Sequence, residues 1–269
     1  MLASVDWHIL SERIFHPDHV FVLALWRTIY ISLCAQILGV VLGLIAALMR
    51  LSSFAPLRWL SGLYVLIFRG TPVIVQIFFV YFGANLLFGF TLIPRTVSVL
   101  GIFQIDGAAF AGIIALGVNE GAYMREIIRA GIDAVDKGQM EAAKSLGMPY
   151  RLAMRRIVLP QATRFIIPPL GNEFNNMLKT TSLLVLISVQ ELFVTFQIMN
   201  GNGPTSFHPF ELFLACAVWF LLLTTIWGFI QGIIERRLEK GTPGATERGP
   251  GWATRLIGVR RRVPLSGVR

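Results

Sequence analysis

Long apolar stretches, separated by shorter polar ones, run along most of the chain. A membrane-spanning helix needs about 20 mostly apolar residues, because it must cross about 30 Å of hydrocarbon. Stretches that approach or exceed this length cover residues 28–49, 59–88, 107–127, 164–199 and 211–234. The pattern therefore predicts an all-α integral membrane protein with five transmembrane helices.

Two of these stretches are too long for one straight helix. The second contains Arg69-Gly70-Thr71-Pro72, and a proline inside a helix removes a hydrogen bond and kinks the helix. The fourth is polar in its first half, and we expect a bend or a re-entrant turn near residues 187–191. We assign Arg69 to the helix break and Glu126 to a cytoplasmic helix end.

Lysine and arginine in the loops predict the orientation, because cytoplasmic loops are enriched in these residues. The opposite set of loops holds only Arg13, Arg27 and Arg95. The enriched set comprises Arg50, Arg58, Arg129, Lys137, Lys144, Arg151, Arg155, Arg156, Arg236, Arg237 and Lys240. We therefore predict an extracytoplasmic N-terminus and a cytoplasmic C-terminus.

The predicted organisation has three parts. Residues 1–19 form an extracytoplasmic segment, and they lack the basic, apolar and small-residue pattern of a removable signal peptide. Residues 20–240 form the five-helix transmembrane domain. Residues 241–269 are rich in glycine, proline and arginine and form a disordered basic tail that contacts lipid headgroups.

The composition supports the membrane assignment. Of 269 residues, 55% are hydrophobic and 14% are charged, whereas soluble domains carry about 25% charged residues. Lysine and arginine outnumber acidic residues by 24 to 15, which in a membrane protein is typical of cytoplasmic loops rather than of nucleic-acid binding. No metal-ligand spacing is present among the histidines, which are His8, His16, His19 and His208.

A polar insert, residues 136–160, lies between the third and fourth stretches. Asp136 is a candidate helix cap, Gly147 a candidate helix stop, and Pro149 a candidate start for a second short helix. Met140, Ala143 and Gly147 share one face at helical spacing. Two short helices with a small-residue face suit docking into a groove on a soluble partner. The alternative is a folded loop that lies on the bilayer.

The insert also carries a recognisable spacing: Glu141-Ala142-Ala143, then Gly147, then Ile157 and Leu159-Pro160. This spacing resembles the EAA loop of membrane subunits of bacterial ABC importers. Further motifs are similar to the polar amino acid permeases, which include histidine and glutamine permease subunits. They are Phe68-Arg69-Gly70-Thr71-Pro72, Gln76, Tyr81-Phe82-Gly83, Gly121-Ala122-Tyr123, Arg129-Ala130-Gly131-Ile132, Gly138-Gln139, Gln161-Ala162, Asn172, Lys179 and Thr181-Ser182-Leu183.

The resemblance implies a type I ABC importer permease in the bacterial plasma (inner) membrane. Its partners would be two cytoplasmic ATPase subunits, a second permease subunit (the same or a sister chain) and an extracytoplasmic substrate-binding protein. The chain has no GxxxxGK[ST] phosphate loop, so ATP and Mg²⁺ would bind the partner ATPase and this subunit would not be an enzyme. The implied ATPase-coupling residues are Glu141, Ala142, Ala143, Gly147, Met148 and Arg151.

Polar residues inside the spans are candidates for substrate binding, because charges in a membrane are costly and usually face a cavity. On the fourth span, Lys179 is a candidate partner for an α-carboxylate. The alternative is that these residues form helix–helix hydrogen bonds. The candidate set is Thr71, Gln76, Asn119, Glu120, Asn172, Asn176, Lys179, Thr180 and Ser182.

Thr180 bears on specificity. Relatives that handle cationic amino acids can carry an acidic residue after the lysine, and a hydroxyl at this position is a weak partner for a guanidinium. The expected substrate is therefore a polar amino acid, with neutral or acidic ones favoured. An ion channel or an ATP-independent small-solute transporter is the alternative function, although neither explains the EAA spacing.

Overall fold

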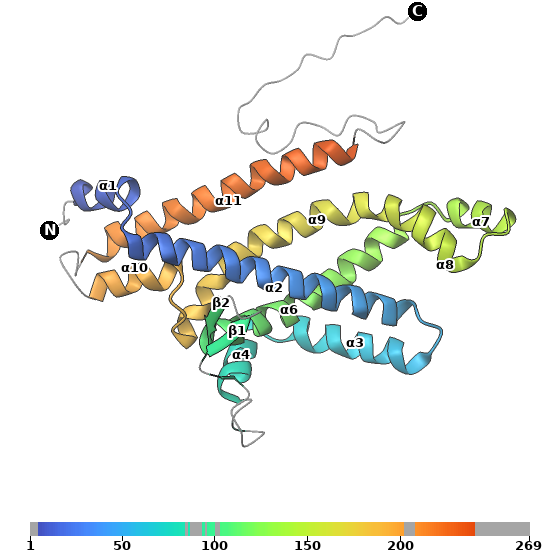
Figure 1. Cartoon of the computed structure of the whole chain (residues 1–269), viewed down its shortest axis with the longest axis horizontal. Helices are drawn as coiled ribbons and strands as arrows, with labels where there is room; N and C mark the ends of the chain where they lie inside the picture. The colour runs from blue at the N-terminus through green and yellow to red at the C-terminus, as the bar shows by residue number, and fades with distance from the viewer. Residues whose placement is uncertain are drawn as a thin grey trace, which may run out of the picture.

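The computed structural model describes residues 5–83, 86, 93–94, 96–99, 103–201 and 208–239. Its longest helices lie roughly along one axis, with α1 and α10 at one end and α7 and α8 at the other (Figure 1). The long helices are α2 (His19–Leu51), α3 (Ala55–Gly70), α6 (Gly107–Asp133), α9 (Leu159–Thr180) and α11 (Pro209–Glu239). The shorter ones are α1 (Trp7–Phe15), α4 (Val73–Phe78), α7 (Lys137–Ser145), α8 (Tyr150–Ala153) and α10 (Leu192–Gly201).

Within the described residues, α2 and α11 are the helices long and apolar enough to cross a membrane alone. α2 has 33 residues and so measures about 50 Å at 1.5 Å per residue. Asp18 starts it, because its Oδ1 accepts a hydrogen bond from Phe21 N at 2.8 Å. α6 fills the third predicted span, but it contains Asn119, Glu120 and Arg125 and does not pass as a span by length and apolarity alone.

The two predicted breaks are confirmed. α3 and the helical segment Val73–Gly83, which combines α4 with the π-helical turn η1 (Phe79–Gly83), meet at 104°. The helical run Tyr150–Ile187 meets the segment Leu192–Met199 at 50°. If each bent pair forms one span, up to four spans satisfy length and apolarity among the described residues, and α6 is the remaining long helix of the bundle.

At the second break, side chains accept hydrogen bonds from the backbone amides that follow it. The 3-10 helix η3 (Thr181–Ile187) ends at Ser188, whose φ of 57° is left-handed. Leu192 N then donates to Thr28 Oγ1 at 3.0 Å, and Val194 N donates to Glu191 Oε1 at 2.9 Å. A backbone break inside hydrocarbon is tolerated where neighbouring groups accept and donate its free hydrogen bonds, which explains why α2 packs here.

Small residues bring α2 and α6 together. A Cβ on Gly43 would overlap the Cβ of Met124, and a Cβ on Gly39 would come within 2.6 Å of Glu120 Cγ. Gly39 and Gly43 on α2 face Gly117 and Gly121 on α6, so each helix contributes two glycines four residues apart. Such small-xxx-small spacing lets membrane helices approach closely, because van der Waals packing replaces the hydrophobic effect in lipid.

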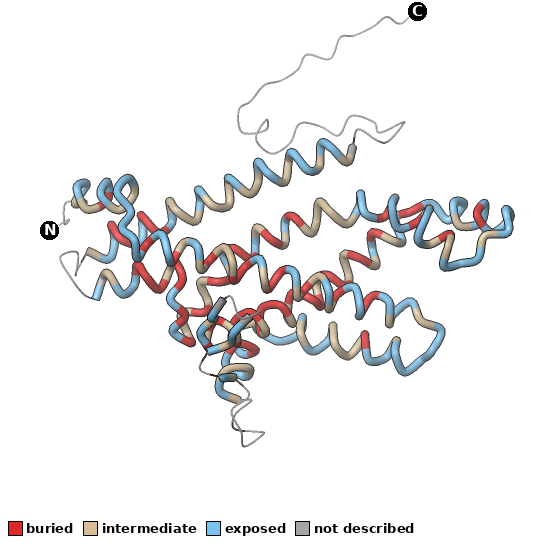
Figure 2. The backbone as a smooth tube through the Cα atoms, in the orientation of Figure 1, coloured by how far each residue is buried: buried red, intermediate tan, exposed pale blue. Residues whose placement is uncertain are grey.

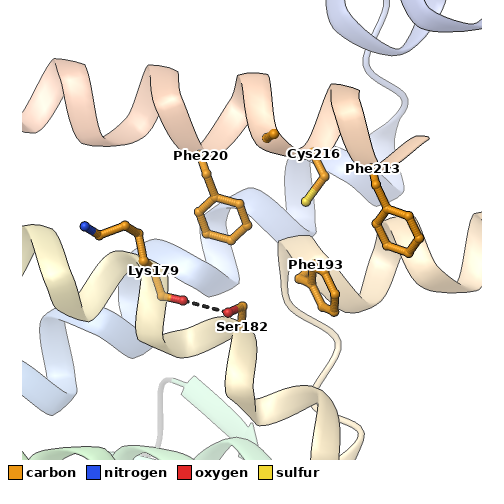
Figure 3. A pocket seen from close by; sticks show the side chains of 7 residues that line it. Lys179, Ser182, Phe193, Phe213, Cys216 and Phe220 are labelled. Carbon is orange, nitrogen blue, oxygen red and sulfur yellow. Dashed lines mark hydrogen bonds between the residues drawn. The ribbon is translucent and has the colours of Figure 1, made fainter. Parts of the chain in front are cut away.

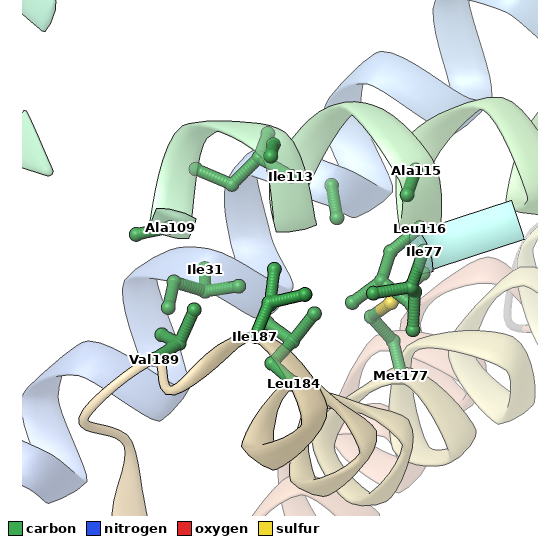
Figure 4. Close-up of a cluster of buried hydrophobic side chains, with 12 residues drawn as sticks. Ile31, Ile77, Ala109, Ile113, Ala115, Leu116, Met177, Leu184, Ile187 and Val189 are labelled. Carbon is green, nitrogen blue, oxygen red and sulfur yellow. The ribbon is translucent and has the colours of Figure 1, made fainter. Parts of the chain in front are cut away.

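The main core lies where α2, α4, α6, α9 and η3 converge (Figure 4). Ile31, Ile77, Leu116 and Leu184 are each at most 1% exposed. Figure 2 shows buried residues concentrated around this junction, whereas most of α11 is exposed or intermediate. The exposed apolar side chains of α11 include Leu221, Ile226, Phe229, Ile230 and Ile233.

A short hairpin, which the sequence patterns did not predict, precedes α6. Strands β1 (Thr96–Val99) and β2 (Phe103–Asp106) pair antiparallel, with Thr96 opposite Asp106 and Val99 opposite Phe103. Asp106 then caps α6, because its Oδ1 accepts from Ala109 N at 2.7 Å. The hairpin therefore leads directly into the α6 start. The predicted tail, residues 241–269, lies outside the described residues.

Candidate functional site

The polar insert contains the helix that its sequence predicts. Asp136 caps α7, since its Oδ1 accepts from Gly138 N at 2.8 Å. At the other end, Met148 N donates to Ala143 O at 3.0 Å and Gly147 N donates to Lys144 O at 2.9 Å. These two bonds and the φ of +76° at Gly147 form a Schellman motif, in which glycine adopts the left-handed conformation at no steric cost. The predicted stop at Gly147 is confirmed.

The second helix of the insert begins after Pro149 as predicted, but it does not end within the loop. α8 continues through the π-helical turn η2 (Met154–Val158) into α9. The chain from Tyr150 to Ile187 is therefore one continuous helical run. Because of this continuity, the loop leads without a break into the helix that carries Lys179.

The implied coupling residues fall into two groups by exposure. Glu141, Ala142, Gly147 and Arg151 are exposed, and Met148 is partly buried. Ala143, in contrast, is only 1% exposed, so it faces the protein rather than the free surface. Sequence reasoning therefore identified the loop, but its small-residue face packs partly inward.

Two large apolar side chains at the tip of the loop were missed. Leu146 is 82% exposed and Tyr150 is 54% exposed, and they lie on either side of Gly147 in sequence. Large exposed apolar side chains in an otherwise polar loop are available for contact with another protein or with the membrane. Their presence between the EAA residues and Pro160 was the signal that was available in the sequence.

The loop is anchored on the ends of α6 and α9. Val135, Val158 and Ala162 form a buried cluster against which Ile132, Met140, Met154 and Ile166 pack. A pocket of ≈ 540 Å³ lies beside this cluster, and its lining includes Leu51, Asp133 and Tyr150. Only residues 134–136 separate α6 from α7. α7 therefore packs directly against the ends of α6 and α9.

The candidate substrate residues lie in three places. Lys179 and Ser182 line an open pocket of ≈ 580 Å³, and Phe193, Phe213, Cys216, Ala217 and Phe220 provide its largely apolar wall (Figure 3). Lys179 is exposed and has no ion-pair partner among the described residues. Lys179 stands at the edge of this wall, and its Nζ points away from Phe193 and Phe213 (Figure 3).

The hydroxyl groups near Lys179 are used by the backbone. Thr180 Oγ1 donates to Asn176 O at 2.9 Å, and Ser182 Oγ donates to Lys179 O at 2.7 Å. The oxygen atoms of both hydroxyl groups can still accept hydrogen bonds. Asn172 Oδ1 accepts from Gln231 Nε2 of α11 at 3.1 Å, so it contributes to the contact between α9 and α11. Asn176 is exposed.

Thr71, Gln76 and Asn119 form a separate group at the break between α3 and α4. Asn119 Nδ2 donates to Gln76 Oε1 at 3.0 Å, and Gln76 Nε2 donates to Thr71 Oγ1 at 2.8 Å. The described residues that line the Lys179 pocket do not include Thr71, Gln76 or Asn119. The structure therefore brings these three residues together with one another, but it does not place them in one chamber with Lys179.

Glu120 faces α2. It is 5% exposed, and its Oε1 accepts from Gln36 Nε2 at 3.1 Å. This contact is a helix–helix hydrogen bond, which is the alternative that the sequence left open for these polar residues. Arg69, assigned to the helix break, lies in the last turn of α3 with its guanidinium 5.1 Å from the centre of the Tyr123 ring.

Comparison with known proteins agrees with this architecture. Residues 39–240 match the family described as binding-protein-dependent transport system inner membrane component. The chain is 43% identical to the arginine transport system permease protein ArgU of Corynebacterium glutamicum, over 90% of this chain and 79% of that protein. It is 36% identical to the probable amino-acid permease protein YxeN of Bacillus subtilis, over 89% of this chain and 98% of that protein.

A solved structure is also similar. The chain has 36% identity and a TM-score of 0.72 to a structure described as an amino acid ABC transporter with histidines, covering 87% of this chain and 99% of that one. The family match alone extends over most of this sequence and contains the whole loop at residues 136–160. The chain therefore belongs to the family of inner membrane components of binding-protein-dependent transport systems, and it is a membrane permease subunit.

Proposed function

We propose that this chain is the permease subunit of an ABC importer that moves a polar amino acid across the plasma membrane, driven by separate ATPase subunits that bind ATP and Mg²⁺. The observation that carries this proposal is the helical loop from α7 to α8, which stands at one end of the bundle (Figure 1). The names of the relatives, an arginine permease and a probable amino-acid permease, support the substrate class.

The ATPase would dock on the exposed loop surface, with Leu146 and Tyr150 as apolar anchors and Glu141 and Arg151 as charged flanks. Exposed apolar side chains that become buried at an interface commonly supply much of its binding energy. A second permease subunit would cover part of the exposed apolar face of α11. The binding protein would approach the opposite end of the bundle, where α1 and α10 lie.

Substrate would bind beside Lys179, whose ammonium group would pair with the α-carboxylate. The lining residues of the pocket include no carboxylate within the described part of the chain, which favours neutral or acidic amino acids over cationic ones. The relative named for arginine transport gives the competing expectation. The choice therefore needs a panel of amino acids that includes arginine.

The test is reconstitution. The tagged chain is co-expressed with the products of its neighbouring genes, purified in detergent and incorporated into proteoliposomes with its binding protein. ATPase activity and uptake are then measured with glutamine, glutamate, histidine and arginine. Co-purification of an ATPase and stimulation by one amino acid are expected. Ion currents without ATP would instead support the channel alternative, and stimulation by arginine alone would overturn the neutral or acidic preference.

A further inference from the structure

We propose that Thr71, Gln76 and Asn119 form an amide latch that holds the break between α3 and α4 and ties it to α6, and that these residues do not contact the substrate. The inference extends the proposed transport function, because it assigns positioning residues to the moving part of the permease. It rests on hydrogen bonds, on the angle of the break, and on the contacts between α3 and α6.

The break creates a demand for hydrogen-bond donors. α3 ends at Gly70, and the next helical segment leaves at 104°. The last carbonyl groups of a helix have no partner within it, and an unpaired carbonyl in hydrocarbon is costly. Pro72 makes the shortage worse, since it has no amide hydrogen.

Two side-chain amides and one hydroxyl meet this demand. Gln76 Nε2 lies 3.0 Å from Phe68 O and 3.1 Å from Thr71 O. Asn119 Nδ2 donates to the same Phe68 O at 2.9 Å. Thr71 Oγ1 donates to Ile67 O at 2.8 Å. The amide donors that a substrate would need are therefore directed at the end of α3.

α3 is attached to α6 along its length. Arg125 Nε donates to Ser61 Oγ at 3.3 Å near the middle of α3, and Tyr64 OH donates to Val118 O at 2.5 Å further along. Asn119 adds the bond to Phe68 O at the end of the helix. α3 and α6 are thus joined at three successive levels, and the break is where the chain leaves this pair.

The same α6 connects to the coupling loop. It ends at Asp133, and α7 begins at Lys137. A movement of α7 therefore reaches the break through α6 and Asn119. Through the latch, movement of the loop that we assign to the ATPase acts on the joint between α3 and α4.

The test compares matched variants. Thr71→Val keeps the side-chain shape and removes the hydroxyl group, whereas Thr71→Ser restores the hydroxyl group. Asn119→Ala and Gln76→Ala are made singly and together, and Gln104→Ala, an exposed amide on β2, is the control. Each variant is reconstituted with its ATPase, and uptake of the amino acid panel is measured together with amide hydrogen exchange at residues 73–78.

For Thr71→Val, Asn119→Ala and Gln76→Ala, we expect the maximal uptake rate to fall about tenfold, because carbonyl groups at the end of α3 lose their donors. KM should stay unchanged for every amino acid, and exchange at residues 73–78 should accelerate. The double variant should be no worse than the worse single variant, because the residues act as one unit. Thr71→Ser should recover both the uptake rate and the exchange protection.

Two results would overturn the latch. A raised KM for a particular amino acid with unchanged exchange would make these residues substrate contacts. Unchanged uptake together with unchanged exchange would show that the break is stable without these side-chain hydrogen bonds. Hydrogen exchange does not depend on transport, so it tests the latch even if the wild-type chain takes up none of the amino acids, which would count against the proposed function alone.

Discussion

At the residue scale, two side chains of the same type can have different roles, because the groups that they contact differ. Asn119 and Asn176 are both amides on long helices, yet Asn119 donates to the end of α3, whereas Asn176 is exposed beside Lys179. Lys179 has no acidic partner in the described part of the chain. An unpaired cation in a membrane protein is costly, and a bound carboxylate would reduce that cost.

Lys179→Ala is expected to lower amino acid uptake strongly while leaving ATPase co-purification unchanged. The reason is that Lys179 supplies the positive charge of the pocket but contacts neither the loop nor its anchoring cluster. Uptake and pull-down are measured on the same preparation. Thr163→Ala, an exposed position on the same helix, is the control. Normal uptake by Lys179→Ala would assign Lys179 a structural task instead.

Gly147→Asp is expected to weaken ATPase docking without removing the subunit from the membrane. An L-residue at the φ of +76° found here carries a cost of about 1–2 kcal/mol, and the aspartate adds a charge at the loop tip. Pull-down of the ATPase provides the measurement. Gly62→Ala is the control, because a Cβ on Gly62 meets nothing within 4 Å. Unchanged co-purification would contradict the assignment of the docking surface.

At the element scale, breaks and close approaches determine how the helices assemble. The glycines of α2 and α6 allow backbone contact, and each bent span is closed by side chains of a neighbouring helix. The loop shows the same dependence, since α7 is held by a cluster from α6 and α9.

Gly43→Leu is expected to destabilise the bundle, because even a Cβ there overlaps Met124. Overpacking of this kind costs about 1–3 kcal/mol, which should lower the midpoint of thermal unfolding in detergent. Gly62→Leu is the matched control, since the space around Gly62 is open. Equal unfolding midpoints for the two variants would indicate that the contact between α2 and α6 accommodates the larger side chain without loss of stability.

Tyr150→Ala and Leu146→Ala are expected to weaken ATPase binding by about 1–2 kcal/mol each, in the range measured for interface anchors. Both side chains are exposed in the isolated subunit, so their removal should leave its unfolding midpoint unchanged. Titration of purified ATPase against the variants in nanodiscs measures the affinity. Ala substitution of exposed Lys144, on the polar face, serves as comparison. Wild-type affinity in both apolar variants would exclude them as anchors.

At the scale of the whole molecule, the end of the loop at residues 136–160 and the Lys179 pocket lie apart on one continuous helical run. The run extends from Tyr150 to Ile187, and α11 is tied to it through Trp227 Nε1, which donates to Gly171 O at 2.7 Å. Most of α11 is exposed or intermediate (Figure 2), and its exposed residues include Leu221, Ile226 and Phe229. An exposed apolar helix face in a permease is available to lipid or to a second subunit.

The assembled transporter is expected to contain two permease subunits and two ATPases. Native mass spectrometry of the complex, extracted with its neighbouring gene products, measures the ratio. The reason is that one loop offers one docking surface, while the exposed face of α11 is available to a second permease chain. A complex with a single permease subunit would contradict this expectation and would leave α11 facing lipid.

The sequence by itself determined what depends on local chemistry. Apolar length predicted the positions of the helices, and Pro72 the first break. Asp136 and Gly147 marked the start and the end of α7, because a cap and a left-handed turn involve only neighbouring residues. The EAA spacing likewise identified the family, since the motif is contiguous in the chain.

Only the tertiary structure decided which groups face each other. A helical period indicates a face, but it does not say which helix covers that face. Gln76 and Asn119 are directed at Phe68 O, and Glu120 at Gln36, because α3 and α2 pack on different, adjoining faces of α6. In the loop too, tertiary packing decides which side is covered: Ala143 is buried and Leu146 is exposed. Polar residues that shared one prediction thus separate into a pocket, a latch and a helix seam.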